Sequence, residues 1–221
     1  MKIRKDIITI AIDSPAAAGA GTQAKYIAKE YNLLYLDTGK VYRYIGFLKL
    51  KNKNFNYKLI KKKIINISLK DLKDKKLLSD KVATSASIIA KDLKIRKIIK
   101  NFQKNFAYNP PKKFSGSVLD GRDITSVIMK DAIVKFYITA NIRVRAKRRY
   151  LEYKKLKKKI TYKEVLKSLK NRDKLDKTRK HSPLKKTQDS ILINTSKLSK
   201  KSCFNKIKTI IDRKIKINGS L

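Results

Sequence analysis

The 221-residue sequence contains no tryptophan, one cysteine and one histidine. Because Cys203 stands alone, it excludes an internal disulfide and a cysteine metal cluster, and it fits a reducing cytoplasm. The single histidine, His181, argues against a histidine-based catalytic triad and against a zinc site. No run of about 18 apolar residues is present, so we expect no membrane-spanning segment. The first residues lead directly into a strand pattern without a cleavage site, so we expect no signal peptide.

Acidic residues are also scarce: 17 of them face 58 lysines and arginines, which gives a formal net charge of +41. Such a charge is typical of proteins that bind nucleic acids or membrane surfaces. The alternative is compositional drift, since lysine is spread over the whole chain together with abundant isoleucine and asparagine. We favour drift because no basic block stands apart from a neutral remainder. We therefore expect no specific nucleic-acid partner and no membrane partner, although the charge would attract nucleotides.

Short apolar runs alternate with helical patterns along the chain. The runs predict five strands, at 7–12, 33–37, 117–120, 133–140 and 190–196. The three-and-four spacing of apolar residues predicts helices at 22–31, 39–50, 81 to about 107 (as one long helix), twice within 141–180, and at the end of the chain. This alternation indicates an α/β fold with a doubly wound, parallel five-stranded sheet covered on both faces.

The stretch "SPAAAGAGT", residues 14–22, follows the first predicted strand and precedes a helix. Small residues allow backbone N–H groups to converge on an anion, and the helix that follows directs its dipole at it. The residues concerned are Ser14, Pro15, Ala16, Ala17, Ala18, Gly19, Ala20, Gly21 and Thr22. However, Ser14 stands where such a loop has its first glycine, and Ala20 stands where it has its lysine. From these residues alone, a phosphate-binding loop and an ordinary strand-to-helix turn are both open.

Three further motifs follow in order: "LDTGKVYR" at 36–43, "DGRDITSVI" at 120–128 and "RDKLDKTRKHSPL" at 172–184. With "IAIDSPAAAGAGT" they resemble the bacterial cytidylate kinase family of P-loop nucleoside monophosphate kinases, over residues 8 to about 196. The resemblance implies one kinase domain over 1–221, with a shortened acceptor-side insert at 51–80 and a helical lid at 141–185. It also implies a cytoplasmic, monomeric enzyme that uses ATP and Mg²⁺ to phosphorylate CMP and dCMP.

The resemblance also implies roles for individual residues. Residues 14–22 would hold the ATP phosphates, and Mg²⁺ would be held indirectly through Thr22 and Asp120. The predicted catalytic residues are Asp120, Arg122, Arg172, Arg179 and Lys40. The predicted substrate-binding residues are Thr38, Arg43, Ser87, Arg96, Asp123 and Asp176. Leu78 stands where relatives often carry arginine.

The residue types agree with this chemistry. Phosphoryl transfer depends on positioning and positive charge, and arginine clamps phosphate with two parallel hydrogen bonds. Arginine is retained at five of these positions in a chain that otherwise prefers lysine, although any one of them could instead pair with a surface carboxylate. For Asp120 the alternative is a helix cap, and for Asp176 it is a structural ion pair. Asp123 is a candidate acceptor for a ribose hydroxyl.

Lys40 is predicted to replace the lysine that the loop lacks. In "LDTGKVYR" it stands at a position that is usually alanine in the family, beside the acceptor phosphate. The alternative is that Lys40 is one more lysine in a lysine-rich chain. Two other functions stay open: a catalytically weak nucleotide-binding protein, and a basic nucleic-acid-binding protein on the kinase fold. The retained arginines argue against both, and the absence of aromatic residues clustered beside the basic runs argues against the second.

Overall fold

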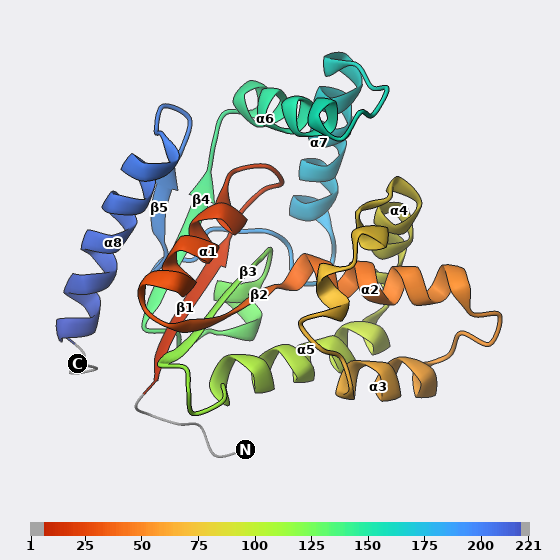
Figure 1. Ribbon diagram of the computed structural model, residues 1–221, viewed down its shortest axis with the longest axis horizontal. Helices are drawn as coiled ribbons and strands as arrows, with labels where there is room; N and C mark the ends of the chain where they lie inside the picture. Colours follow the sequence, from red (N-terminus) through yellow and green to blue (C-terminus); the bar gives the residue numbers. More distant parts are fainter. Residues whose placement is uncertain (1–6, 218–221) are drawn as a thin grey trace.

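Five parallel strands form the centre of the computed structural model, which describes residues 7 to 217 (Figure 1). They are β1 (Ile8–Asp13), β2 (Leu33–Asp37), β3 (Gly116–Gly121), β4 (Val134–Thr139) and β5 (Ile191–Asn194). Their order across the sheet is β2-β3-β1-β4-β5, and every neighbouring pair is parallel. The connections from β1 and β3 leave in opposite directions, so their carboxyl ends form the kind of crevice in which α/β sheets bind ligands.

Helices connect the strands and cover both faces of the sheet. They are α1 (Ala20–Glu30), α2 (Thr38–Lys51), α3 (Tyr57–Ile65), α4 (Asp80–Ile89), α5 (Leu93–Tyr108), α6 (Ile142–Lys155), α7 (Tyr162–Thr178) and α8 (Lys200–Ile217). Three short turns complete the set: η1 (Asp71–Lys73), η2 (Lys75–Leu78) and the π-helical turn η3 (Ile124–Ile128). Of the helices in the described part of the chain, none has the length and apolar character needed to cross a membrane.

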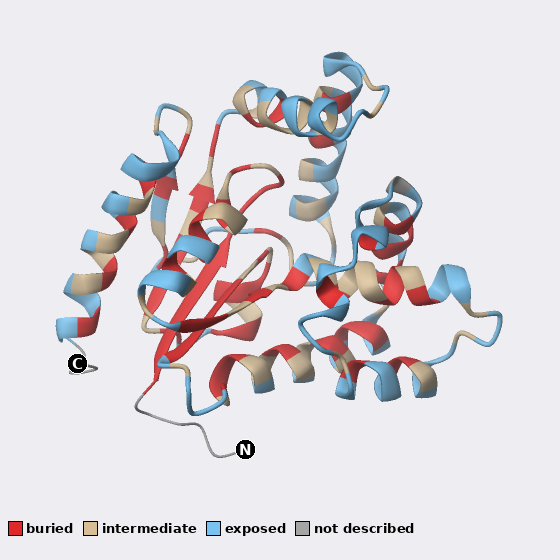
Figure 2. Cartoon of the chain, viewed as in Figure 1, coloured by how far each residue is buried: buried red, intermediate tan, exposed pale blue. Residues whose placement is uncertain are grey.

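The central strands β1 and β3 are buried on both faces, as Figure 2 shows, because their side chains alternate between two hydrophobic clusters, whereas the edge strand β5 exposes Leu192 and Asn194. Ile10 and Ile12 pack on the side of α1 and α8. Ala11, between them in β1, packs on the other side, together with apolar residues of α2, α3 and α5. A period of two places successive residues on opposite faces. The prediction of a doubly wound parallel sheet is confirmed.

The prediction of one long helix from 81 to about 107 is wrong. The chain instead forms α4 and α5, which are separated at residues 90–92. Asp92 caps the second helix, since its carboxylate accepts a hydrogen bond from the Ile95 N–H at 3.0 Å. The apolar periodicity continues on both sides of this cap, so it does not reveal the break. Asp92 itself is the local signal, because aspartate favours helix N-caps.

The insert at 51–80 folds as α3 followed by η1 and η2, and this part of the described chain forms no strand. α4 packs closely on α2 at Gly46, where an added Cβ would lie 2.8 Å from the Ala86 nitrogen. The Ser85 hydroxyl donates to the Gly46 carbonyl at 3.0 Å across the same contact. Figure 1 shows this group of helices beside the sheet, with α6 and α7 standing apart from it beyond the strand ends.

Candidate active site

The loop between β1 and α1 has the backbone conformation of an anion-binding turn. Gly19 lies in the left-handed region at φ 94° and occupies the N-cap of α1, and Ala17 has φ 61°. Left-handed backbone is unfavourable for residues with a Cβ, so Ala17 is held there by its surroundings. The first N–H groups of α1 have no side-chain cap at Gly19 and are therefore available to an anion. This backbone conformation is compatible with a bound phosphate although residue 20 is alanine, and phosphate binding by the loop stays a prediction.

Two arginines of α6 hold this loop from outside. Arg145 is buried, pairs with Asp173 of α7, and donates from Nη1 to the Ala16 carbonyl at 3.1 Å. Arg148 donates to the Thr195 carbonyl at 2.7 Å and to the Thr195 hydroxyl at 2.8 Å. That hydroxyl donates in turn to the Ala18 carbonyl at 2.9 Å. The lid helices and the end of β5 are thus connected to the loop backbone.

Arg145 and Arg148 are not among the residues that the sequence predicts for the site. The pattern that indicated the other site arginines, an arginine in a chain that otherwise prefers lysine, would also have indicated these two residues. Arg148 also lies over the loop, since an added Cβ on Gly19 would be 3.9 Å from its Nη1 atom.

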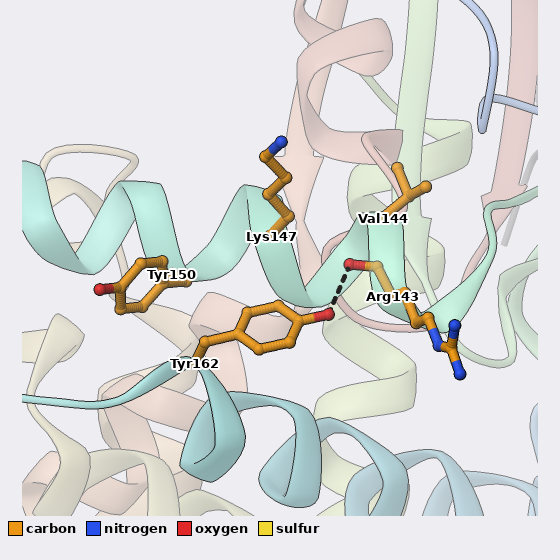
Figure 3. Close-up of a pocket in the computed structure, with 5 residues that line it drawn as sticks. All are labelled: Arg143, Val144, Lys147, Tyr150 and Tyr162. Atoms are coloured by element: carbon orange, nitrogen blue, oxygen red, sulfur yellow. Dashed lines mark hydrogen bonds between the residues drawn. The ribbon is translucent and has the colours of Figure 1, made fainter.

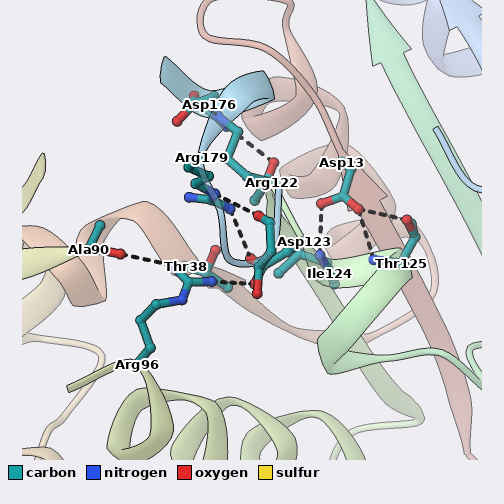
Figure 4. Close-up of polar contacts among 12 residues, drawn as sticks. Asp13, Thr38, Ala90, Arg96, Arg122, Asp123, Ile124, Thr125, Asp176 and Arg179 are labelled. Atoms are coloured by element: carbon teal, nitrogen blue, oxygen red, sulfur yellow. Dashed lines mark hydrogen bonds and ion pairs between the residues drawn. The ribbon is translucent and has the colours of Figure 1, made fainter. Parts of the chain in front are cut away.

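Asp13, the last residue of β1, connects the loop to the "DGRD" segment. Its buried carboxylate accepts hydrogen bonds from the Ile124 N–H at 2.8 Å, the Thr125 N–H at 2.9 Å and the Thr125 hydroxyl at 2.6 Å (Figure 4). Burial raises the pKa of Asp13 to about 6, and these three hydrogen bonds oppose the shift. Asp13 therefore fixes the start of η3, directly after Arg122 and Asp123.

Asp120 lies at the carboxyl end of β3, directly beside the loop. An added Cβ on Gly21 would be 3.6 Å from its Oδ2 atom, and the Tyr35 hydroxyl donates to Oδ1 at 2.9 Å. Burial, and then the negative charge of Asp37, raise the pKa of Asp120 to about 8, while Lys25 and Arg122 act in the opposite direction. Asp37 is the register partner of Asp120 on β2. The Tyr35 hydrogen bond, rather than a helix cap, is the side-chain contact that the structure shows for Asp120.

Two ion pairs, one buried and one half-buried, form the centre of the site (Figure 4). Arg96 of α5 pairs with Asp123 at 2.7 Å, and Arg122 pairs with Asp176 of α7 at 2.7 Å. Arg96 also donates to the Ala90 carbonyl at 3.3 Å, in the break between α4 and α5. The site therefore joins the insert, the sheet and the lid, and the structural ion pair considered for Asp176 is present.

Arg172 and Arg179 add positive charge to these pairs. Arg172 lies 3.9 Å from Asp176, and burial together with the nearby guanidinium of Arg122 lowers the pKa of Arg172 to about 10. Arg179 lies 3.9 Å from Asp123, and its Nε donates to the Ser182 carbonyl at 2.6 Å. Its buried Nη2 atom has no hydrogen-bond partner within the described residues. Unpaired buried donors are costly, so this atom is well suited to an anionic ligand.

The described structure therefore brings together six of the predicted residues, and we call them the arginine–aspartate cluster: Arg96, Arg122, Asp123, Arg172, Asp176 and Arg179. Arg43 is close enough to lower the pKa of Arg172 by charge repulsion, and its Nη1 donates to the Leu77 carbonyl at 2.8 Å. Positive charge exceeds negative charge here. A bound phosphate would relieve the repulsion between the guanidinium groups.

Three predicted residues lie outside this cluster and make only hydrogen bonds to other residues. The Thr38 hydroxyl donates to the Asp120 carbonyl at 2.8 Å, so it positions the end of β3. Ser87 is exposed, and its hydroxyl donates to the Ala83 carbonyl within α4 at 3.1 Å. Lys40 is half-buried in the first turn of α2, where its backbone N–H donates to Asp37 at 3.3 Å. Their roles toward a ligand stay predictions.

A hollow on the lid lies outside this site (Figure 3). It is lined by Arg143, Val144, Lys147, Tyr150 and Tyr162, none of which belongs to the arginine–aspartate cluster. The two tyrosine rings meet edge to face with centroids 6.2 Å apart, and the Tyr162 hydroxyl donates to the Arg143 carbonyl at 3.4 Å. These contacts hold α6 against the start of α7.

Comparison with known proteins gives a consistent result. A family model described as "Cytidylate kinase" matches residues 10–213. The "Cytidylate kinase" of Bartonella bacilliformis is 41% identical over 218 residues, which cover 96% of this chain and 98% of that protein. The protein of the same name from Clostridium tetani is 37% identical over 221 residues and covers 94% of this chain and 95% of its own.

Among solved structures, an uncharacterized protein from Eubacterium ventriosum superposes with a TM-score of 0.55. The match covers 93% of this chain and 98% of that one at 20% sequence identity. This likeness supports the fold.

Proposed function

The chain belongs to the cytidylate kinase family, and on that premise we propose that it transfers a phosphoryl group from ATP to CMP and dCMP. The products are ADP with CDP or dCDP. The observation that carries the proposal is the arginine–aspartate cluster, which lies at the same strand ends as the phosphate-binding loop. Arginine supplies planar, permanently charged donors for a transferring phosphoryl group. One kinase domain over 1–221, acting as a monomer in the cytoplasm, belongs to the same proposal.

The loop of residues 14–22 binds the ATP phosphates through the first N–H groups of α1. Its backbone geometry depends on Gly19 and on small neighbours, which the chain retains. Arg145 and the Arg148–Thr195 contact keep the loop in this conformation from the lid side. The donor site is therefore preorganised before a nucleotide binds.

The residues beside the loop also fit Mg²⁺. Asp120 and its register partner Asp37 place two carboxyl groups at neighbouring strand ends, where burial and then the charge of Asp37 raise the pKa of Asp120 to about 8. A divalent cation would stabilise the ionised carboxylate. Asp120 and the hydroxyl of Thr22 would hold the ion indirectly, and the ion would neutralise charge on the phosphates.

The acceptor nucleotide lies between the insert and the arginine–aspartate cluster. Arg43 and Arg96 direct its phosphate, Thr38 fixes the adjoining strand end, and Ser87 faces the base. Asp123 and Asp176 accept hydrogen bonds from the nucleotide once it displaces part of their ion pairs. An oxygen of the CMP phosphate attacks the γ-phosphorus in line, and the bond to the bridging oxygen of ADP breaks without a covalent enzyme intermediate.

During transfer Arg122, Arg172 and Arg179 neutralise the charge on the moving phosphoryl group. Arg172 and Arg179 belong to the lid region at 141–185, whose closure excludes water from the reaction. The Nη2 of Arg179, which lies 3.9 Å from Asp123 and makes no hydrogen bond within the described residues, is the donor that supports this role most directly.

The test is a coupled assay of ADP release with CMP, dCMP, UMP and AMP as acceptors. We expect turnover of CMP and dCMP but not of AMP, because a site built for one base leaves buried polar groups unpaired with another. Equal turnover of CMP and AMP would contradict the proposed acceptor. Nucleotide binding without ADP release would favour the catalytically weak nucleotide-binding protein.

A further inference from the structure

The loop that binds phosphate has no cation of its own. Residues 14–22 contain neither lysine nor arginine, and Ala20 is 3% exposed within the hydrophobic cluster on the α1 side of the sheet. A loop lysine normally reaches the outer phosphates of ATP. An enzyme that turns over ATP needs this charge from another element, because a preorganised donor is worth about 10²–10³ in rate.

The cations on the lid side of the loop already have partners. Arg145 pairs with Asp173 and holds the Ala16 carbonyl. Arg148 uses two of its donors on Thr195. Each of these contacts positions the loop, so a guanidinium that left its partner for a phosphate would release the loop backbone that it holds.

The opposite side of the loop faces the end of β2. Tyr35 of β2 reaches Asp120 at the end of β3 and the first turn of α1: its hydroxyl donates to Asp120 at 2.9 Å and would lie 3.4 Å from an added Cβ on Gly21. A single side chain from β2 therefore spans the distance to the loop. α2 begins directly after β2, and Lys40 belongs to its first turn.

Lys40 is also free to bind an anion. Its side chain is half-buried, unlike Lys49 and Lys51 at the other end of α2, and none of the ion pairs among the described residues involves it. Only its backbone N–H is engaged, with Asp37 at the N-cap. Lysine carries a mobile point charge on a flexible four-carbon stem, which suits contact with a phosphate from a neighbouring element.

We propose that the Lys40 ammonium contacts the outer phosphates of ATP and replaces the lysine that the loop has lost. The inference rests on the proposed function. Lys40 is a catalytic residue that transfers no proton: the bond from the γ-phosphorus to ADP breaks, the bond to the CMP oxygen forms, and Lys40 donates hydrogen bonds to the phosphate oxygens that carry the charge.

The first experiment compares K40A with K49A in the ADP-release assay with CMP. K49A is the matched control, because it makes the same charge change at an exposed position of the same helix. We expect K40A to lower kcat by at least ~30-fold and K49A to leave kcat unchanged. Thermal unfolding of both variants should match that of the parent, since Lys40 makes no ion pair that folding would lose.

The second experiment restores the ammonium. In K40C, 2-bromoethylamine converts the thiolate to a thioether that ends in an ammonium, with bromide as the leaving group. K40A treated in the same way is the control, and Cys203 is 2% exposed and common to both. We expect alkylation to raise kcat of K40C at least ~10-fold and to leave K40A unchanged. The double variant K40A/A20K, which returns lysine to the loop, should also exceed K40A.

The outcomes separate this inference from the proposed function. Full activity in K40A would overturn the replacement by Lys40 while leaving the kinase intact. K40C could also fold normally, lose activity and fail to recover it on alkylation. That result would overturn the replacement by Lys40, because the missing ammonium would not be the cause of the lost activity. Absence of CMP phosphorylation by the parent protein would instead refute the proposed function.

Discussion

Asp13→Asn tests whether burial or hydrogen bonding has the larger effect on the pKa of the Asp13 carboxylate at the end of β1. The Asp13 carboxylate accepts from the Ile124 N–H, the Thr125 N–H and the Thr125 hydroxyl. An asparagine amide has one oxygen, and its NH₂ group cannot accept, so a backbone N–H at Thr125 loses its partner. An unsatisfied buried donor costs about 1–3 kcal/mol.

The pH dependence of this cost follows from the pKa of Asp13, which burial raises from 3.8 to about 6. The pKa of Asp13 is higher in the folded state than in the unfolded state. Its favourable contribution to the free energy of unfolding is therefore complete below about pH 4 and is lost as the pH rises through 6. Two pKa units correspond to about 3 kcal/mol. D13N, which has no such group, should therefore be less stable than the parent near pH 4 and of similar stability by pH 7.

The assay is urea unfolding of the parent, D13N and D131N at pH 4, 5, 6 and 7, with the free energy of unfolding extrapolated to water. D131N is the matched control, because it removes one carboxylate at an exposed position. A destabilisation by D13N that is constant, or that grows toward pH 7, would refute the reasoning. It would show that Asp13 is ionised throughout and that its three hydrogen bonds outweigh burial.

Three further predictions concern the site and the charge. Arg179→Lys should lower kcat/KM about 10²-fold or more, since lysine cannot make a two-point contact with phosphate; a loss below ~3-fold would place Arg179 outside the site. Arg145→Lys should raise KM for ATP more than KM for CMP, because it weakens the hold on the Ala16 carbonyl; an equal change in both would contradict this. Binding to DNA should be non-specific and should fade steeply with salt, and tight sequence-selective binding at physiological salt would favour the nucleic-acid-binding alternative.

The strands could be predicted from sequence because each is a short apolar run bounded by polar or turn residues, and the five predicted runs match β1 to β5 within two residues at each end. The division between α4 and α5 could not, since the apolar spacing continues through residues 90–92. Periodicity reports which face is buried and is insensitive to a break that keeps the face in register. The Asp92 cap was visible in the sequence, but aspartate is also common on exposed helix surfaces.

The site was predictable where a motif specifies it and not where tertiary contact does. The "DGRD" and "RDKLDKTR" motifs placed Arg122, Asp123, Asp176 and Arg179 together, and the structure confirms that they meet. Tyr35 was missed, because a tyrosine in an apolar strand has no local signal for the 2.9 Å contact with Asp120. Its role appears only when β2 and β3 are seen to be neighbours.

Arginine in this chain marks positions where geometry matters. Only eleven of the 58 basic residues are arginine. Eight of them lie in or beside the site: Arg43, Arg96, Arg122, Arg145, Arg148, Arg149, Arg172 and Arg179. A composition that shifts toward lysine replaces arginine wherever a point charge suffices, so the survivors are those whose planar fork is needed. The proposed role of Lys40 agrees with this argument. A single contact with a phosphate needs a positive charge on a long, flexible side chain and not a planar guanidinium, and lysine provides such a charge.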